Sequence, residues 1–271
     1  PTSIVIVDDT LVWSDSLGAT WMMPSDGSKP AAQLSDAQRP NFAFHLVVAG
    51  DTVFATSRKD LLRVQSDGVH AMNLRLKELP EESAADASAV YITMFKRSEV
   101  MRIPISGGAP TKLADVPRGV LGIHGGTLYA ASYSAGTLVA IPTAGGPAKQ
   151  LASNLPRPTA VAADDSAVYV YCERDKAIRR IDLAGGAVTI IARDLENSDD
   201  LVSDGPYLWT ITWGAQPGLV RVMKDGSRPA QRLTADIKTP NKVTVDAHAV
   251  YVSSREHSRI VKLVKSALPA P

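Results

Sequence analysis

Six polar side chains, spread widely along the sequence, have the chemistry to hold a metal ion or to position a water molecule. They are Glu81, Glu82, Asp199, Asp200, Asn241 and His45. Carboxylate and amide oxygens are the ligands that hard divalent cations prefer, and a bound cation can activate water. Carboxylates brought close together repel one another unless a cation or a proton intervenes. If the fold gathers these residues, we therefore expect either a divalent ion such as Ca²⁺ or Mg²⁺ or raised carboxyl pKa values.

The same residue types also have a purely structural use, as solvated carboxylates that cap loop turns, and no contiguous catalytic motif decides between the two. The sequence contains no G-x-S-x-G elbow, no G-x-G-x-x-G motif, no phosphate loop and no C-x-x-C pair. None of the five histidines forms a metal-binding pair such as H-E-x-x-H. His45 and His257 lie nearest to the expected site.

A repeat in the chain indicates the elements that must position these residues. An apolar strand, a tight polar turn and a second strand that contains an aromatic residue recur seven times, at intervals of about 40 residues. The aromatic anchors are Trp13, Phe54, Tyr91, Tyr129, Tyr169, Trp209 and Tyr251. This period is typical of radially repeated four-stranded units. We predict an all-β, seven-bladed β-propeller with one blade per anchor.

Turn residues divide each repeat into strands. Asp and Gly precede the anchors at positions where a tight corner is needed, and a second Gly-Gly or Asp-Gly turn follows a third strand in six units. The seventh unit lacks that second turn, so we expect three strands between about 242 and 264. Either this blade does without a fourth strand, or residues upstream of Pro1 supply it. The predicted blades of a single domain, 1–271, lie near 3–41, 42–80, 81–118, 119–158, 159–198, 199–240 and 241–265.

The inner strand of each propeller blade lines a central channel, so the starts of these strands converge on one axis; Ile4–Asp8 is the expected inner strand of the first blade. Counting back nine residues from each anchor gives Ile4, His45, Glu82, Val120, Ala160, Asp200 and Lys242. Counting back ten gives Ser3, Phe44, Glu81, Gly119, Thr159, Asp199 and Asn241. All six chemically capable residues belong to these two sets. We therefore place a ligand-binding site at the mouth of the channel.

Composition excludes several classes of function. The 29 basic and 28 acidic residues give a net charge of +1, which offers no basic face for nucleic acid. No apolar run approaches the roughly 18 residues of a membrane-spanning helix. The single cysteine, Cys172, follows an anchor and is predicted to be a small buried hydrophobe. We expect a secreted or periplasmic protein, with the cytoplasm as the alternative compartment.

Two segments carry a resemblance to a known superfamily: GTLYAASYSAGTLVAIPTAGGP at 126–147 and AVYVYCERDKAIRRIDLAGGA at 167–187. With the repeats around them, they resemble the bacterial β-propellers of the YVTN, NHL and gluconolactonase-like groups, over essentially the whole chain. These groups include lactonases, lyases, ligand sensors and adaptors, so the resemblance specifies a fold and not an activity. The gluconolactonase-like enzymes hold a channel metal with acidic and Asn side chains. By resemblance, that set is drawn here from Glu81 or Glu82, Asp199 or Asp200, Asn197 and Asn241, and foremost from Glu81, Asp199 and Asn241.

Three hypotheses for function follow. The first is a non-enzymatic recognition scaffold that binds a protein, peptide or glycan through the loop face around the channel, where Trp213, Tyr133 and charged side chains have the composition of an interface. The second is a metal-assisted lactonase- or lyase-type enzyme at the channel mouth. The third is a ligand-sensing domain of a larger envelope protein. The absence of a catalytic constellation favours the first.

Overall fold

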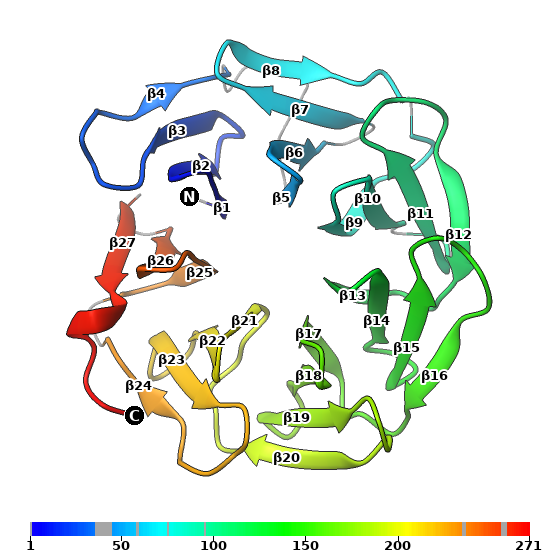
Figure 1. The fold of residues 1–271 in the computed structure, drawn as a ribbon, viewed down its shortest axis with the longest axis vertical. Coiled ribbons are helices and arrows are strands. Elements are labelled where there is room, and N and C mark those ends of the chain that lie inside the picture. The colour runs from blue at the N-terminus through cyan, green and yellow to red at the C-terminus, as the bar shows by residue number, and fades with distance from the viewer. Residues whose placement is uncertain are drawn as a thin grey trace.

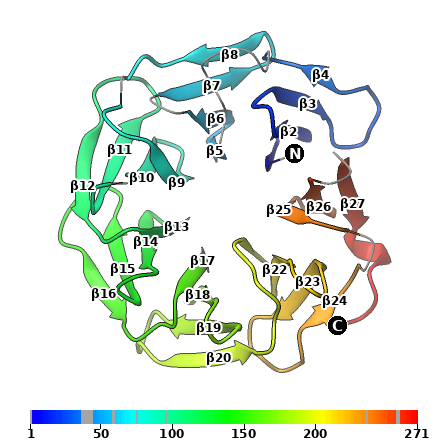
Figure 2. The same ribbon diagram turned by 180° about the vertical axis from the view of Figure 1, so that it is seen from behind.

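Seven antiparallel sheets surround a central axis in the structure, a computed structural model that describes residues 2–35, 45–57, 60–74, 76–94, 96–234, 237–255 and 259–271. Figures 1 and 2 show the ring from its two sides. Six sheets contain four strands and one contains three, and the only helix in the described ranges is the 3₁₀ turn η1 (Lys265–Ala267). The predicted seven-bladed, all-β propeller is confirmed. No helix of the described residues is long and apolar enough to cross a membrane.

Blades are numbered along the chain, and the strands within each blade run from the axis outwards. Blade 1 contains β1 (Ser3–Val7), β2 (Thr10–Ser14), β3 (Thr20–Pro24) and β4 (Ala32–Gln33). Blade 2 contains β5 (Leu46–Ala49), β6 (Thr52–Thr56), β7 (Leu61–Gln65) and β8 (Gly68–Ala71). Blade 3 contains β9 (Pro80–Ala85), β10 (Ala89–Met94), β11 (Glu99–Pro104) and β12 (Thr111–Asp115).

The remaining blades repeat this order. Blade 4 contains β13 (Gly119–His124), β14 (Thr127–Ser132), β15 (Thr137–Pro142) and β16 (Lys149–Ala152). Blade 5 contains β17 (Pro158–Ala163), β18 (Ala167–Cys172), β19 (Ala177–Asp182) and β20 (Val188–Ala192). Blade 6 contains β21 (Leu201–Asp204), β22 (Tyr207–Thr212), β23 (Gly218–Met223) and β24 (Gln231–Arg232). Blade 7 contains β25 (Pro240–Val245), β26 (Ala249–Ser254) and β27 (Arg259–Val264).

The ring closes as the repeat predicted. β1 pairs with β2, and Figure 1 shows β1 as the inner strand of blade 1. Within the described ranges, blade 7 has no fourth strand beside β27. The chain instead turns towards blade 6, where the Arg221 guanidinium donates a 2.6 Å hydrogen bond to the Pro269 carbonyl. Leu268 packs with the apolar side chains between blades 6 and 7.

Because the strands are antiparallel, each end of the ring has its own set of connections. We call one end the loop face: it carries the starts of the inner strands, the loops between second and third strands, and the connections between blades. The opposite end, the turn face, carries the tight turns between first and second strands and between third and fourth strands. The chemically capable residues therefore lie on the loop face, and the Asp-rich turns lie on the turn face.

The aromatic anchors hold the turns to the blades. In four blades, a carboxylate oxygen of the turn Asp accepts a hydrogen bond from the anchor five residues later, at 2.7 to 3.0 Å. The pairs are Asp86 with Tyr91, Asp164 with Tyr169, Asp204 with Trp209 and Asp246 with Tyr251. We call them the turn-face latches. All four anchors are at least 99% buried, so the recurring phrase encodes both a buried ring and its hydrogen-bond partner.

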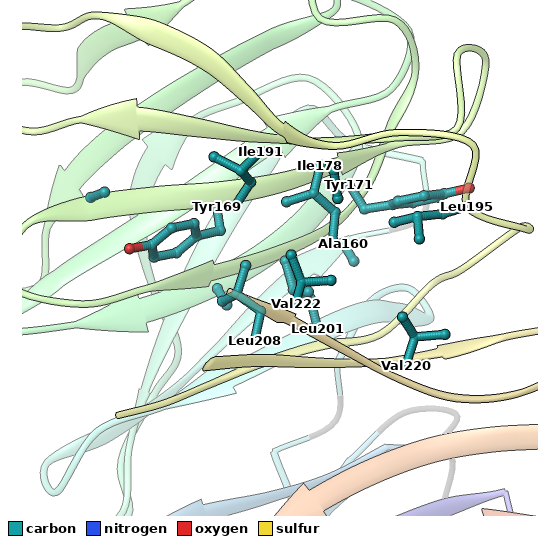
Figure 3. Packing of buried hydrophobic residues seen from close by; sticks show 13 residues of the cluster. Ala160, Tyr169, Tyr171, Ile178, Ile191, Leu195, Leu201, Leu208, Val220 and Val222 are labelled. Carbon is teal, nitrogen blue, oxygen red and sulfur yellow. The ribbon is translucent and has the colours of Figure 1, made fainter. Parts of the chain in front are cut away.

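Apolar side chains pack between neighbouring blades in buried clusters. In Figure 3, Tyr169 and Ile178 of blade 5 face Leu208 and Val222 of blade 6, and all four belong to one buried cluster. Equivalent clusters join the other blades around the ring. Cys172 is fully buried in one of them, as predicted, and burial raises the pKa of its thiol to about 11.

Candidate functional site

The channel mouth on the loop face contains a cavity of about 240 Å³ that all seven inner strands line. The residues nine positions before the anchors all contribute to its wall: Ile4, His45, Glu82, Val120, Ala160, Asp200 and Lys242. Going round the ring, His45 and Glu82 form one polar pair in blades 2 and 3. Asp200 and Lys242 form a second in blades 6 and 7. Apolar side chains of blades 1, 4 and 5 separate the two pairs.

Residues one position earlier have a different role, because successive side chains of a strand point in different directions. Several of them bond to the next blade. The Ser3 hydroxyl accepts a 3.0 Å hydrogen bond from the Leu46 amide, and the Thr159 hydroxyl donates one of 2.9 Å to the Ser198 carbonyl. The Asn241 amide donates to the Thr2 carbonyl and so joins blade 7 to blade 1. These contacts are inter-blade ties, although Ser3, Thr159 and Asp199 also reach the cavity wall.

Glu81 belongs to the same set of ties. One of its carboxylate oxygens accepts a hydrogen bond from the Arg118 guanidinium and a 2.6 Å hydrogen bond from the Tyr133 hydroxyl. Arg118 also stacks over the Tyr133 ring, with its guanidinium carbon 5.6 Å from the ring centre. Burial and the neighbouring Glu81 carboxylate raise the pKa of Tyr133 well above its ordinary value. Glu81 thus joins blade 3 to blade 4 and is not part of the cavity wall.

Two cavity carboxyls are held in an unfavourable environment. Burial raises the pKa of Asp200, and the Lys242 charge and a 2.7 Å hydrogen bond from the Val243 amide only partly oppose it. Burial likewise raises the pKa of Glu82, against the attraction of Lys242. Low dielectric favours the neutral form of an acid, so these carboxyls hold protons more tightly than exposed ones do.

The two basic residues of the cavity are in opposite states. Burial disfavours the Lys242 ammonium, but the charges of Asp200, Asp199 and Glu82 outweigh that effect and raise its pKa. Its Nζ lies 3.6 Å from the Asp200 carboxylate. Burial, reinforced by the Lys242 charge, lowers the pKa of His45 to about 4, against the attraction of nearby carboxylates. At neutral pH the cavity therefore contains an ammonium and a neutral imidazole.

Four of the six predicted site residues line the cavity: His45, Glu82, Asp199 and Asp200. Lys242 also lines the cavity. It lies nine residues before Tyr251, but it is not among the predicted site residues because a basic side chain does not suit a metal site. Glu81 and Asn241 bond to neighbouring blades instead. Phe44 and His257 lie outside the described residues.

A metal centre built from Glu81, Asp199 and Asn241 stays a prediction. Among the described residues, no group of three or more His, Cys, Asp or Glu side chains is placed to hold an ion. The Glu81 carboxylate already accepts two hydrogen bonds from Arg118 and Tyr133. The donor set around the cavity offers isolated carboxylates and an ammonium, which is a better match for hydrogen-bonded or organic ligands than for a hard cation that needs six to eight oxygens.

Three exposed apolar side chains lie on the loop face, on which the cavity opens. Leu17 and Trp213 stand in loops between second and third strands and are 64% and 42% exposed. Leu79 immediately precedes β9 and is 46% exposed. Single exposed hydrophobics are ordinary on protein surfaces, so these three matter only because they share a face with the cavity. Their place beside the polar cavity makes the loop face the best candidate for an interaction surface.

Comparison with solved structures places the chain among β-propellers. It resembles the virginiamycin B lyase from Staphylococcus aureus with a TM-score of 0.80 at 16% identity, over 97% of this chain and 94% of that one. A streptogramin B lyase gives 0.78 at 14% identity, over 99% and 93%. A chain from a nidogen/laminin complex gives 0.64 at 15%, over 79% and 89%. Identities this low support the fold alone. No family model matches the sequence, and no curated protein matches it.

Proposed function

We propose that the protein is a recognition scaffold that binds a peptide segment of a partner across the loop face, with one ligand side chain inserted into the channel cavity. The observation that carries this proposal is the junction of a small polar cavity with exposed apolar residues on the same face. The proposal rests on this site and not on the fold, because one fold can carry many unrelated functions.

The size of the cavity supports a peptide over a free small molecule. Pockets for drug-sized ligands have volumes of about 300 to 1,000 Å³, and this one has about 240 Å³. It can enclose one side chain, so the remaining contact area must come from the surrounding loops. Leu17, Leu79 and Trp213 offer that area, and Trp is enriched among the residues that dominate binding energy in protein interfaces. One of the solved neighbours comes from a complex between two proteins.

A displayed library of random peptides, selected on the immobilised protein, tests this proposal. We expect the selected peptides to lose about tenfold or more in affinity for a Trp213→Ala variant, because a buried aromatic contact is worth about 2 kcal/mol. Val188→Ala is the matched control, since Val188 is 46% exposed but lies at the turn-face end of β20. Binders that ignore Trp213 and Leu17 but respond to Val188 would refute a loop-face site.

A lyase- or lactonase-type enzyme is the second candidate, and one observation favours it. Glu82 and His45 share a cavity, and burial raises the pKa of the acid while it lowers that of the base. Shifted pairs of this kind are common among general acids and bases. Two solved neighbours are named as lyases.

Incubation with a panel of cyclic esters, with and without Mg²⁺ or Ca²⁺, separates the enzyme from the scaffold. Mass spectrometry would show a gain of one water for a lactonase and an unchanged mass with an opened ring for a lyase. Loss of turnover in both His45→Gln and Glu82→Gln would support the enzyme. Turnover that survives both changes would exclude this cavity as its active site.

A further inference from the structure

We propose that the channel cavity receives an organic cation, an ammonium or guanidinium group on an alkyl chain, and that Glu82 is the residue that binds it. This inference rests on the proposed recognition function and names the chemistry of the inserted side chain. Its basis is the balance of charge in the cavity, the absence of any partner for the Glu82 carboxyl within the described part of the chain, and the arrangement of apolar walls.

The cavity has more acidic than basic groups. Glu82, Asp199 and Asp200 contribute three carboxyls to its lining, against the single ammonium of Lys242. His45 adds no positive charge at neutral pH, because burial and the Lys242 charge lower its pKa to about 4. A cation that enters therefore meets more carboxyls than ammonium groups, and its charge favours the ionised form of a carboxyl that burial otherwise keeps protonated.

The Lys242 ammonium serves the Asp200 side of the ring. It lies 3.6 Å from one oxygen of that carboxylate, while the other oxygen accepts the 2.7 Å hydrogen bond from the Val243 amide. Asp200 therefore has two partners. The fixed positive charge of Lys242 also repels a second cation from blades 6 and 7, which directs the ligand across the axis towards blades 2 and 3.

Glu82 lies on that opposite side, where the Lys242 charge attracts it at a distance, but Lys242 forms its ion pair with Asp200. Its backbone amide donates a 3.1 Å hydrogen bond to the Thr93 hydroxyl, but no hydrogen bond or ion pair of the described residues reaches its carboxyl. The preceding residue, Glu81, has both Arg118 and Tyr133. A carboxyl in a channel wall without a partner must either hold a proton or wait for a cation. Burial does raise the pKa of Glu82.

The apolar part of the ring suits the rest of such a ligand. Ile4 of blade 1 separates the two polar pairs on one side, and Val120 and Ala160 of blades 4 and 5 separate them on the other. An alkyl stem can pack against these side chains while its charged end reaches Glu82, which is how Lys and Arg side chains partition between apolar and polar surroundings. A hydrated metal ion would gain nothing from these walls.

The test combines a free amine with peptides that carry the same group. n-Butylammonium is titrated calorimetrically into the wild-type protein, Glu82→Gln and Glu173→Gln. Glu173 is the matched control because it lies at the loop face with its own partner, Arg157 at 3.1 Å, outside the cavity. Peptides selected on the loop face are then resynthesised with each Lys or Arg replaced by norleucine, which keeps a similar apolar stem and removes the charge.

We expect one basic residue of each selected peptide to be essential, with a loss of about tenfold or more on replacement by norleucine or on Glu82→Gln, and no loss on Glu173→Gln. Loop-face binders that tolerate norleucine, or that carry an acidic residue in its place, would overturn the cation but leave the scaffold standing. Binding of n-butylammonium that depends on Glu82, with no loop-face peptide selected, would uphold the cation and overturn the peptide scaffold. Absence of both would overturn both.

Discussion

The two ends of the inner hairpins treat their carboxyl groups in opposite ways. At the turn face, Asp86, Asp164 and Asp246 have lowered pKa values, because hydrogen bonds outweigh burial, which alone would raise them. The anchor Tyr hydroxyl and backbone amides donate these bonds to Asp86 and Asp246, and the Lys224 ammonium and backbone amides donate them to Asp164. At the channel mouth, burial raises the pKa values of Glu82 and Asp200 because too few donors compensate it.

The difference is consistent with our proposal that the channel mouth binds a ligand, whereas the turn face contributes to stability. Asp86, Asp164 and Asp246 each accept hydrogen bonds from backbone amides of their own blade, as Asp164 does from Ser166 and Ala167 at 2.9 and 3.0 Å. Asp164 also accepts one from Lys224 of blade 6. A buried carboxyl without hydrogen-bond donors lowers the stability of the fold unless another interaction offsets the cost. Departures from self-consistency of this kind concentrate at functional sites.

The largest expected effect is loss of a turn-face latch. Asp164→Ala removes hydrogen bonds to two backbone amides, the Tyr169 hydroxyl and the Lys224 ammonium, the last at 2.8 Å. We expect the free energy of unfolding to fall by about 2 to 4 kcal/mol, because buried donors and an ammonium lose their acceptor. Urea denaturation measures the change. Asp165→Ala, at the next position, removes only a contact with His124 and is expected to change stability by about 0.5 kcal/mol or less.

At the channel mouth, the second prediction concerns His45. Its pKa of about 4 means that the unfolded chain binds a proton below pH 6.5 while the folded protein does not. Stability is therefore lost as the pH falls from 6.5 towards 4, by about 3 kcal/mol for this group. Replacement by Gln should remove that share of the loss. The difference in pH-dependent stability between His45→Gln and wild type reports the contribution of the imidazole alone. The charges of Lys242, Asp199, Asp200 and Glu81, which influence its pKa, are present in both proteins.

An NMR titration provides the direct measurement for this prediction. One imidazole should titrate near pH 4, and its signal should be missing from the spectrum of His45→Gln. An ordinary midpoint near 6.5 for every imidazole would show that the channel mouth is less desolvated than the structure indicates, and the contrast between the two faces would lose half of its support.

Most of the architecture could be predicted from the sequence, because each blade repeats the same local signals. The spacing from Trp13 to Tyr251 fixed the number of blades, and the lack of a second Gly-rich turn after Lys262 indicated the three-stranded seventh blade. Such signals are local, so propensity and turn chemistry are enough to detect them. The hydrogen bond from four of the anchors to the Asp five residues earlier is likewise local, and only its geometry awaited the structure.

The site could be predicted only to its position along each inner strand. Counts of nine and of ten residues from the anchors were both compatible with the pattern, and adjacent residues of a strand face different ways. Glu82 and Asp200 proved to line the cavity, whereas Glu81 and Asn241 tie blades together. No sequence pattern shows that the partner of Glu81 is Arg118, because that contact crosses between blades.

The third prediction is a gain of stability, whereas the first is a loss. Glu82→Gln removes the carboxyl that burial penalises, and we expect the ligand-free protein to gain about 1 kcal/mol of stability at neutral pH. The pKa of Glu82 is raised on folding, so its wild-type contribution is present at low pH and is lost as the pH rises through that raised value. Unfolding curves of the two proteins should therefore converge in acid and separate towards neutrality. Destabilisation by this change would mean that the carboxyl has a partner at neutral pH.

The smallest expected effect is the loss of one inter-blade hydrogen bond at the loop face, which should change stability and leave ligand binding intact. Asn241→Ala removes one hydrogen bond, from its amide to the Thr2 carbonyl, at the point where blade 7 meets blade 1. A single hydrogen bond of this kind contributes about 0.5 to 1.5 kcal/mol, so the midpoint in urea should fall slightly. Binding of n-butylammonium should not change, because the cation is assigned to Glu82 on the other side of the axis. If the variant keeps its stability and loses ligand binding, Asn241 belongs to the site after all. Side chains nine and ten residues before the anchors would then both contribute to ligand binding.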